Sequence, residues 1–210
     1  MACGSSKDDA GTASTEGQAL TATTPSTTPA TTVPTAASMR PLLLTTAEVG
    51  PGWTASAPSD TSADSLPSCL KGLTSISPDR PGAEQEWEQP SGAFFDESME
   101  FAGADTISSE FAAATALFDG CKDLTLDVQG VTLTGTIAPV PLTAGDQSAG
   151  YELTFTANGI TLVMDLGIVA VNGYELSTGV GSVGAADHAT FADLTAKAVA
   201  KIEAGGGQTA

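Results

Sequence analysis

The sequence predicts an α+β fold in which an antiparallel β-meander sheet carries amphipathic helices packed on it, giving two layers. Two observations predict this fold class. Segments 105–120 and 187–204 repeat apolar residues at the spacing of one helix face. Between them, residues 131–183 alternate apolar and polar residues and contain two Asn-Gly dipeptides, which are a strong signal for β-hairpins.

The composition limits the partners of the protein. The chain has 210 residues and a formal net charge of -18, from 25 acidic and 7 basic residues. Such a surface repels phosphate, so nucleic acid and anionic membrane surfaces are poor partners, and no nucleic acid is expected to bind. Solubility of a secreted protein is the simpler explanation of the acidity. No stretch has the ~20 apolar residues that a membrane-spanning helix needs.

The first 40 residues are predicted to be a disordered tether. Residues 11–38 consist mainly of Thr, Ala, Ser and Pro, and they offer too little apolar surface to offset the entropy of ordering. The α+β domain is expected over residues 41–204, followed by a disordered tail over 205–210. Ser/Thr/Pro-rich stalks of this kind are also sites of O-glycosylation.

Cys3 stands just before the tether, in "MACGSS". This start resembles the mature end of a bacterial lipoprotein, in which a Leu-x-Ala/Gly-Cys box is cut before a cysteine that receives diacylglycerol. The apolar segment and the Leu of that box are missing from this chain. The resemblance implies that Cys3 is the lipid anchor that holds the protein on the outer face of the cell membrane. An incidental thiol of a cytosolic protein is the alternative.

Cys69 and Cys121 are the two remaining cysteines. In an oxidising compartment, two cysteines of one small domain usually form a disulfide. Metal binding is the alternative, but the two cysteines and His188 make only three ligands and lack the short Cys-x-x-Cys spacing of structural zinc sites. We therefore expect a structural disulfide and no bound metal or cofactor.

The first half of the domain is predicted to contain short elements. A helical turn capped by Thr45 or Thr46 ends at Gly50, and a second turn surrounds Cys69. Residues 83–89 are a possible edge strand. Residues 93–101 form a strand with Phe95, Met99 and Phe101 on one side and Asp96, Ser98 and Glu100 on the other.

The second half contains the two helices and the hairpins. Asp105 is the expected N-cap of the first helix, which ends at Gly120, and Asp187 caps the closing helix. Two-residue turns at 158–159 and 172–173 place apolar residues opposite apolar residues: Phe155 with Leu162, Leu153 with Met164, Tyr151 with Leu166, Val171 with Tyr174 and Val169 with Leu176. Gly167, where the alternation changes phase, is a candidate bulge.

Candidate site residues lie in "EQEWEQ", where Glu84, Glu86 and Glu88 share one side of a strand and Trp87 takes the other. We predict that Trp87, Glu86 and Glu88 bind a ligand, with a core position as the alternative for Trp87. The Asp-x-Asp-x-Asp-Gly loop of calcium sites is absent from the sequence. No Gly-x-Ser-x-Gly elbow accompanies His188, so no catalytic residue is predicted, and His188 is expected in the first turn of a helix.

The order of elements resembles the PknH-like extracellular sensor domain of bacterial receptor kinases and envelope lipoproteins. The resemblance covers about residues 41–203 and rests on "PLLLTTAEVGPGW", the cysteine of "LPSC", the Trp of "EWEQ", "EFAAATALFDGCKDL" and "FADLTAKAVAKI". It implies an antiparallel sheet with packed helices, a ligand cleft, and Cys69 and Cys121 as family disulfide cysteines. Kinase-linked members carry a second disulfide that this chain lacks.

The sequence thus predicts a lipid-anchored, extracytoplasmic, non-catalytic sensor-like domain of the bacterial envelope. Its partner is expected to be an envelope small molecule, glycan or protein, with the membrane reached through Cys3. An apolar-ligand carrier, a protein-interaction scaffold and a hydrolase are the alternatives. The sequence names no ligand.

Overall fold

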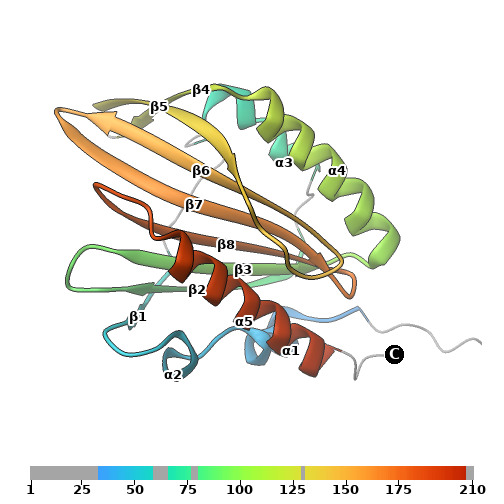
Figure 1. Ribbon diagram of the computed structural model, residues 1–210. Coiled ribbons are helices and arrows are strands. Elements are labelled where there is room, and N and C mark those ends of the chain that lie inside the picture. The colour runs from blue at the N-terminus through green and yellow to red at the C-terminus, as the bar shows by residue number, and fades with distance from the viewer. Residues whose placement is uncertain (1–32, 59–65, 77–79, 129–130, 207–210) are drawn as a thin grey trace, which may run out of the picture. The chain divides into compact units, whose positions relative to one another are not determined.

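The computed structural model describes residues 33–58, 66–76, 80–128 and 131–206, all within the unit Thr31–Ala210. The strands are β1 (Thr54–Ser56), β2 (Gly82–Glu88), β3 (Phe94–Phe101), β4 (Asp123–Val128), β5 (Val131–Val140), β6 (Gln147–Ala157), β7 (Ile160–Val171) and β8 (Tyr174–Val183). They form one antiparallel sheet in the order β1-β2-β3-β8-β7-β6-β5-β4 (Figure 1). The predicted α+β class with an antiparallel sheet is confirmed.

The helices differ greatly in length. The short helices are α1 (Ala36–Met39), α2 (Thr46–Val49) and α3 (Leu73–Ile76), with the 3-10 turns η1 (Arg40–Leu42) and η3 (Ser68–Leu70). The long ones are α4 (Ala104–Gly120) and α5 (His188–Gly206). Within the part of the chain that the structure describes, no helix combines the length and the apolar character needed to cross a membrane.

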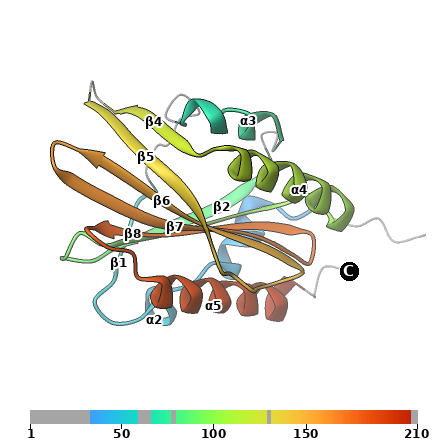
Figure 2. The ribbon, with the colours of Figure 1, turned by 45° about the horizontal axis from the view of Figure 1, so that its top comes forward.

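The long helices cover opposite faces of the sheet (Figure 2). Phe118 of α4 packs with Tyr151 and Ile168, whereas Phe191 of α5 packs with Val169. Because neighbouring residues of a strand point to opposite faces, Ile168 and Val169 show that both faces of β7 are buried. The two layers expected from the sequence therefore become three over the centre of the sheet.

The two Asn-Gly hairpins have the predicted register. Phe155 pairs with Leu162 across the β6–β7 turn, and Val171 pairs with Tyr174 across the β7–β8 turn. Asn158 and Asn172 both have φ of 51°. This positive φ, followed by glycine, is the geometry that two-residue hairpin turns require.

Gly167 does not form the predicted bulge. It pairs without interruption with Gly150 on β6 and Thr178 on β8. A Cβ at this position would meet the side chains of Thr178 and Phe191. The glycine therefore allows α5 to approach the sheet, and the change of phase reflects the burial of both faces of β7.

Three further predictions need correction. The strand β2 is not an edge strand, because β1 pairs outside it. Residues 36–39, assigned to the tether, form α1, whose Met39 is fully buried in the core. The N-cap of α4 is Gly103, and Asp105 lies in the first turn, where a carboxylate still interacts favourably with the helix dipole.

The other capping predictions are confirmed. Thr45 forms a capping box with Glu48 at the start of α2. The side chain of Asp187 accepts hydrogen bonds from the backbone N–H (3.0 Å) and the hydroxyl of Thr190 at the start of α5. The apolar face predicted for segment 187–204 is buried in α5, with its four side chains in the core: Phe191, Leu194, Ala198 and Ile202.

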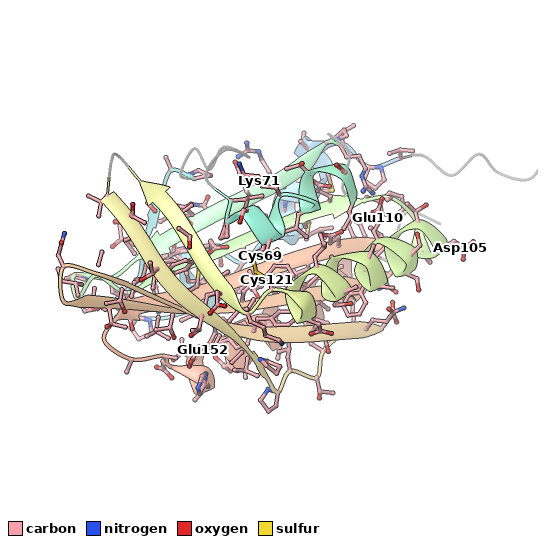
Figure 3. The ribbon with its side chains drawn as sticks, turned by 90° about the horizontal axis from the view of Figure 1, so that it is seen from above. Cys69, Lys71, Asp105, Glu110, Cys121 and Glu152 are labelled. Carbon is pink, nitrogen blue, oxygen red and sulfur yellow. A yellow bond between two sulfur atoms is a disulfide. The ribbon has the colours of Figure 1, made fainter. Side chains whose placement is uncertain are left out.

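A disulfide joins Cys69 of η3 to Cys121, directly after α4 (Figure 3). Cys121 is buried and packs with Leu70, Phe118 and Leu124. The bond therefore fixes the end of α4 to the segment between β1 and β2.

We expect the Cys69→Ser/Cys121→Ser variant, made in a Cys3→Ser background, to lose stability. Closing a loop of 52 residues stabilises the fold by about 4 kcal/mol in the chain-entropy description. Guanidinium unfolding of the variant and of the Cys3→Ser protein measures the difference. Equal midpoints for the two proteins would show that the disulfide does not constrain the unfolded chain.

Candidate functional site

A groove of about 1020 Å³ lies on the sheet face that also carries α4. Five acidic residues border it: the carboxylates of Glu84, Glu86, Glu88 and Asp96 lie on this face, whereas that of Glu97 bonds the backbone N–H of Leu44. Phe94, Met164 and Leu166 contribute apolar surface. The described residues that line the groove include no lysine, arginine or histidine. The groove therefore combines negative charge with an apolar floor.

The pairing of β2 with β3 places these carboxylates together. Glu86 is directly opposite Asp96, and Glu88 is opposite Phe94. Because side chains alternate along a strand, every second residue of β2 faces the groove. Cross-strand neighbours lie about 4.5–5.5 Å apart at their Cβ atoms, so the charges of Glu86 and Asp96 repel each other.

Two glycines of β8 leave space at the base of the groove, because they have no side chains. Gly179 is opposite Asp96, and Gly181 is opposite Phe94. A Cβ at Gly179 would collide with the carboxylate of Asp96, and a Cβ at Gly181 would collide with the ring of Phe94. Both side chains of β3 therefore lean over β8 because β8 has no side chains there.

Burial, together with the negative charge of Glu86, raises the pKa of Asp96 to about 6. Asp96 is thus partly protonated close to neutral pH. Carboxyl groups with such shifts concentrate at functional sites, which supports the groove as the candidate site.

An ion-pair cluster lies farther along the same face, where β2 and β3 approach α4. Arg80, just before β2, is 2.6 Å from Glu110 of α4 (labelled in Figure 3) and 3.7 Å from Glu100 of β3. Burial and the charges of Glu100 and Glu110 raise the pKa of Glu175, while Arg80 lowers it. Arg80 therefore links the sheet to α4.

Glu97 is fully buried on the opposite face, among the residues that pack with α5. Its Oε2 accepts a hydrogen bond of 2.8 Å from the backbone N–H of Leu44. The pKa of Glu97 is raised to about 7, because the effect of burial exceeds the opposing effects of the Leu44 N–H and the charge of Lys201. Glu97 thus ties the segment before β1 to the sheet.

His188 begins α5, as expected. Its Nδ1 is 2.7 Å from Oδ2 of Asp165, and its Nε2 is 3.6 Å from Oε2 of Glu152. Glu152 and Asp165 are cross-strand partners on β6 and β7, on the face that carries α5. These three side chains are the group that can hold a metal ion among the described residues.

The structure places some of the predicted site residues in the groove and others elsewhere. Glu86 and Glu88 line the groove, and their role as ligand contacts stays a prediction. Trp87 does not line it: the side chain is 1% exposed and stacks on Phe95 with ring centroids 5.0 Å apart. The prediction that Trp87 faces a cleft is wrong, because alternation turns it into the core. Cys3 lies outside the described residues.

Asp96 and Asp165 were missed as site residues. Asp96 could have been found by pairing "EQEWEQ" with "FFDESMEF" as a hairpin, because this pairing places Glu86 opposite Asp96. Asp165 could have been found from the hairpin register that the Asn158-Gly159 turn predicts, because this register places Asp165 opposite Glu152.

Comparisons with known proteins show the fold. No family model matches the chain, and no curated protein matches it. The crystal structure of the extracellular domain of PknH from Mycobacterium tuberculosis matches with a TM-score of 0.61 and 14% identity, over 78% of this chain and 93% of that one. A putative uncharacterized protein from Mycobacterium smegmatis matches with a TM-score of 0.44 and 14% identity, over 74% of this chain and 95% of that one. The PknH-like fold inferred from the order of elements is confirmed.

We expect the protein to be more stable at pH 5 than at pH 7.5. The pKa values of Asp96 and Glu97 are about 6 and about 7 in the folded state, above their ordinary values, so their contribution is greatest below about pH 4 and is lost as the pH rises through 6 and 7. Thermal unfolding should therefore show a midpoint several degrees higher at pH 5.

The Glu97→Gln variant keeps an acceptor for the Leu44 N–H and removes the buried acid. It should reduce the difference between the two pH values. An unchanged difference would show that Glu97 does not contribute, and would leave Asp96 and the net charge of the protein as its sources.

Proposed function

We propose that the protein is an extracytoplasmic sensor-like domain of the bacterial envelope that binds a ligand in the acidic groove and is not an enzyme. The fold shared with the extracellular domain of PknH supports the class of protein. The groove itself supports ligand binding, because four carboxylates line it although like charges destabilise neighbouring strands. This observation carries the proposal.

The lining indicates the chemistry of the ligand. Glu84, Glu86, Glu88 and Asp96 favour a positively charged group. Phe94, Met164 and Leu166 favour an apolar part beside that charge. We therefore propose a ligand with a cationic group next to an apolar portion. A carrier of purely apolar ligands is disfavoured, since burying a hydrocarbon chain beside these carboxylates would cost their hydration.

We further propose that Cys3 carries the lipid anchor and that the Thr/Pro-rich segment separates the domain from the membrane. The sequence around Cys3 and the composition of residues 11–38 support this arrangement. It places an acidic domain near a membrane surface without requiring the domain itself to contact anionic lipids.

Glycoside hydrolysis is a second candidate function, favoured by one observation. Asp96 and Glu86 are cross-strand partners in a groove, and the raised pKa of Asp96 keeps part of it protonated near neutral pH. Glycosidases use such a pair of carboxyl groups, one as acid and one as base or nucleophile. Release of reducing sugar from envelope glycans, lost in Asp96→Asn, would support hydrolysis over simple binding.

Octyltrimethylammonium, used below its micelle concentration, tests the proposed ligand class, and octanoate is the matched anionic probe. Saturable shifts of amide NMR signals from β2, β3 and β8 are expected with the cation and not with the anion. In Glu86→Gln/Asp96→Asn the affinity should fall about tenfold or more, because two charges next to the ligand are removed.

The control variant for this titration is Asp193→Asn/Glu203→Gln. It removes the same charge from exposed positions of α5, on the opposite face. If the control weakens binding as much as the groove variant does, the cation is held by the net charge of the protein and the groove is not the site.

Lipidation is tested by expression in a bacterial host behind a lipoprotein signal peptide. The protein should partition into detergent, and Cys3→Ser should return it to the aqueous phase. Detergent partitioning that survives the substitution would contradict the anchor.

A further inference from the structure

Three side chains with metal-binding atoms meet on the face of the sheet opposite the groove. They are Glu152 of β6, Asp165 of β7 and His188, the first residue of α5. One ligand atom from each lies within 4.8 Å of the other two. The site is therefore assembled from two neighbouring strands and a helix that follows them in the chain.

The two carboxylates are placed unfavourably unless a cation accompanies them. Glu152 and Asp165 are direct cross-strand partners, and like charges in this position destabilise a sheet. The side chain of Asp165 is fully buried, and its Oδ1 has no hydrogen-bond partner among the described residues. An unpaired oxygen on a buried carboxylate is costly, so the arrangement calls for a positive charge.

The neighbouring basic side chains are engaged elsewhere. Lys197 of α5 is 2.8 Å from Asp193, and Lys201 bonds Glu48 and the Leu43 carbonyl. Asp187, beside His188, uses its carboxylate to cap α5. His188 is thus the basic group facing the pair. Its side chain is 58% exposed, which leaves the site open to ions and water.

We propose that Glu152, Asp165 and His188 bind a divalent transition-metal ion, with water completing the coordination. One imidazole nitrogen and two carboxylate oxygens form a ligand set that Zn²⁺ accepts, whereas Ca²⁺ and Mg²⁺ prefer oxygen ligands alone. Ligand distances of about 2.0–2.2 Å from Zn²⁺ require these atoms to rearrange, and His188 Nδ1 and Asp165 Oδ2, now 2.7 Å apart, cannot both bind the ion while they share a hydrogen bond. The exposed His188 and the half-buried Glu152 have the rotamer freedom to do so.

The test uses the full chain without a polyhistidine tag. His188 is the only histidine of the protein, so NMR signals of the imidazole report on this site alone. Titration with Zn²⁺ should shift these signals until one equivalent is bound, and the affected nitrogen identifies the ligand atom. Mg²⁺ at the same concentration should leave the imidazole unchanged.

Variants distinguish Zn²⁺ binding at this site from the general attraction of cations to a protein with a net charge of -18. Glu152→Gln and Asp165→Asn should each weaken Zn²⁺ binding at least about tenfold. The Asp193→Asn/Glu203→Gln control, which removes two exposed carboxylates of α5, should bind Zn²⁺ as the parent does. Since Asp165 is buried, the amide spectrum of each variant is recorded first to show that it folds. His188→Gln changes an exposed side chain and should also abolish binding.

Unshifted imidazole signals in the presence of Zn²⁺, or equal losses in the site and control variants, would overturn the metal site. In that case His188 only links the two carboxylates through its contacts with Asp165 and Glu152. Failure of the groove titration would not affect this outcome, because the groove lies on the other face of the sheet and is tested with an organic cation.

Discussion

The register of the β6–β7–β8 hairpins decides which side chains share a face, and both candidate sites depend on it. The turns at Asn158 and Asn172 set this register, because their positive φ values fix two-residue loops. It places Glu152 opposite Asp165 on one face and Leu166 opposite Gly179 on the other. A slip of one residue would exchange the two faces and dismantle both sites at once.

The unequal cover of the sheet explains why a groove exists on one face. The helix α4 packs mainly against β6, β7 and β8. The strands β2 and β3 follow β8 in the sheet, on the side that ends with β1. Polar residues are tolerated on this uncovered part, so it carries Glu84, Glu86 and Asp96. On the other face, α5 and the segment containing α1 and η1 pack against Trp87, Phe95 and Met99. The same two strands therefore provide the core on one side and the groove lining on the other.

The sequence predicts the parts of this structure that local patterns control. Apolar pairs across the Asn-Gly turns, the buried stripe of α5 and the caps at Thr45 and Asp187 all follow from short-range rules. The faces occupied by the two helices do not follow, since an amphipathic stripe is the same whichever side of a sheet it covers. Burial of Glu97 and the meeting of His188 with Asp165 also depend on distant segments, which join only in the folded chain.

In the part of the chain that the structure describes, the few basic side chains form ion pairs with some of the acidic residues and not with others. Arg80 neutralises Glu110 and Glu100 where α4 meets the sheet, and Lys201 neutralises Glu48 near the buried Glu97. Structural carboxylates thus receive a partner from the chain. Among the described residues, the lining of the groove contains no basic side chain, and Oδ1 of Asp165 has no hydrogen-bond partner. At Asp165, the buried oxygen without a partner is the cost that the proposed cation would offset.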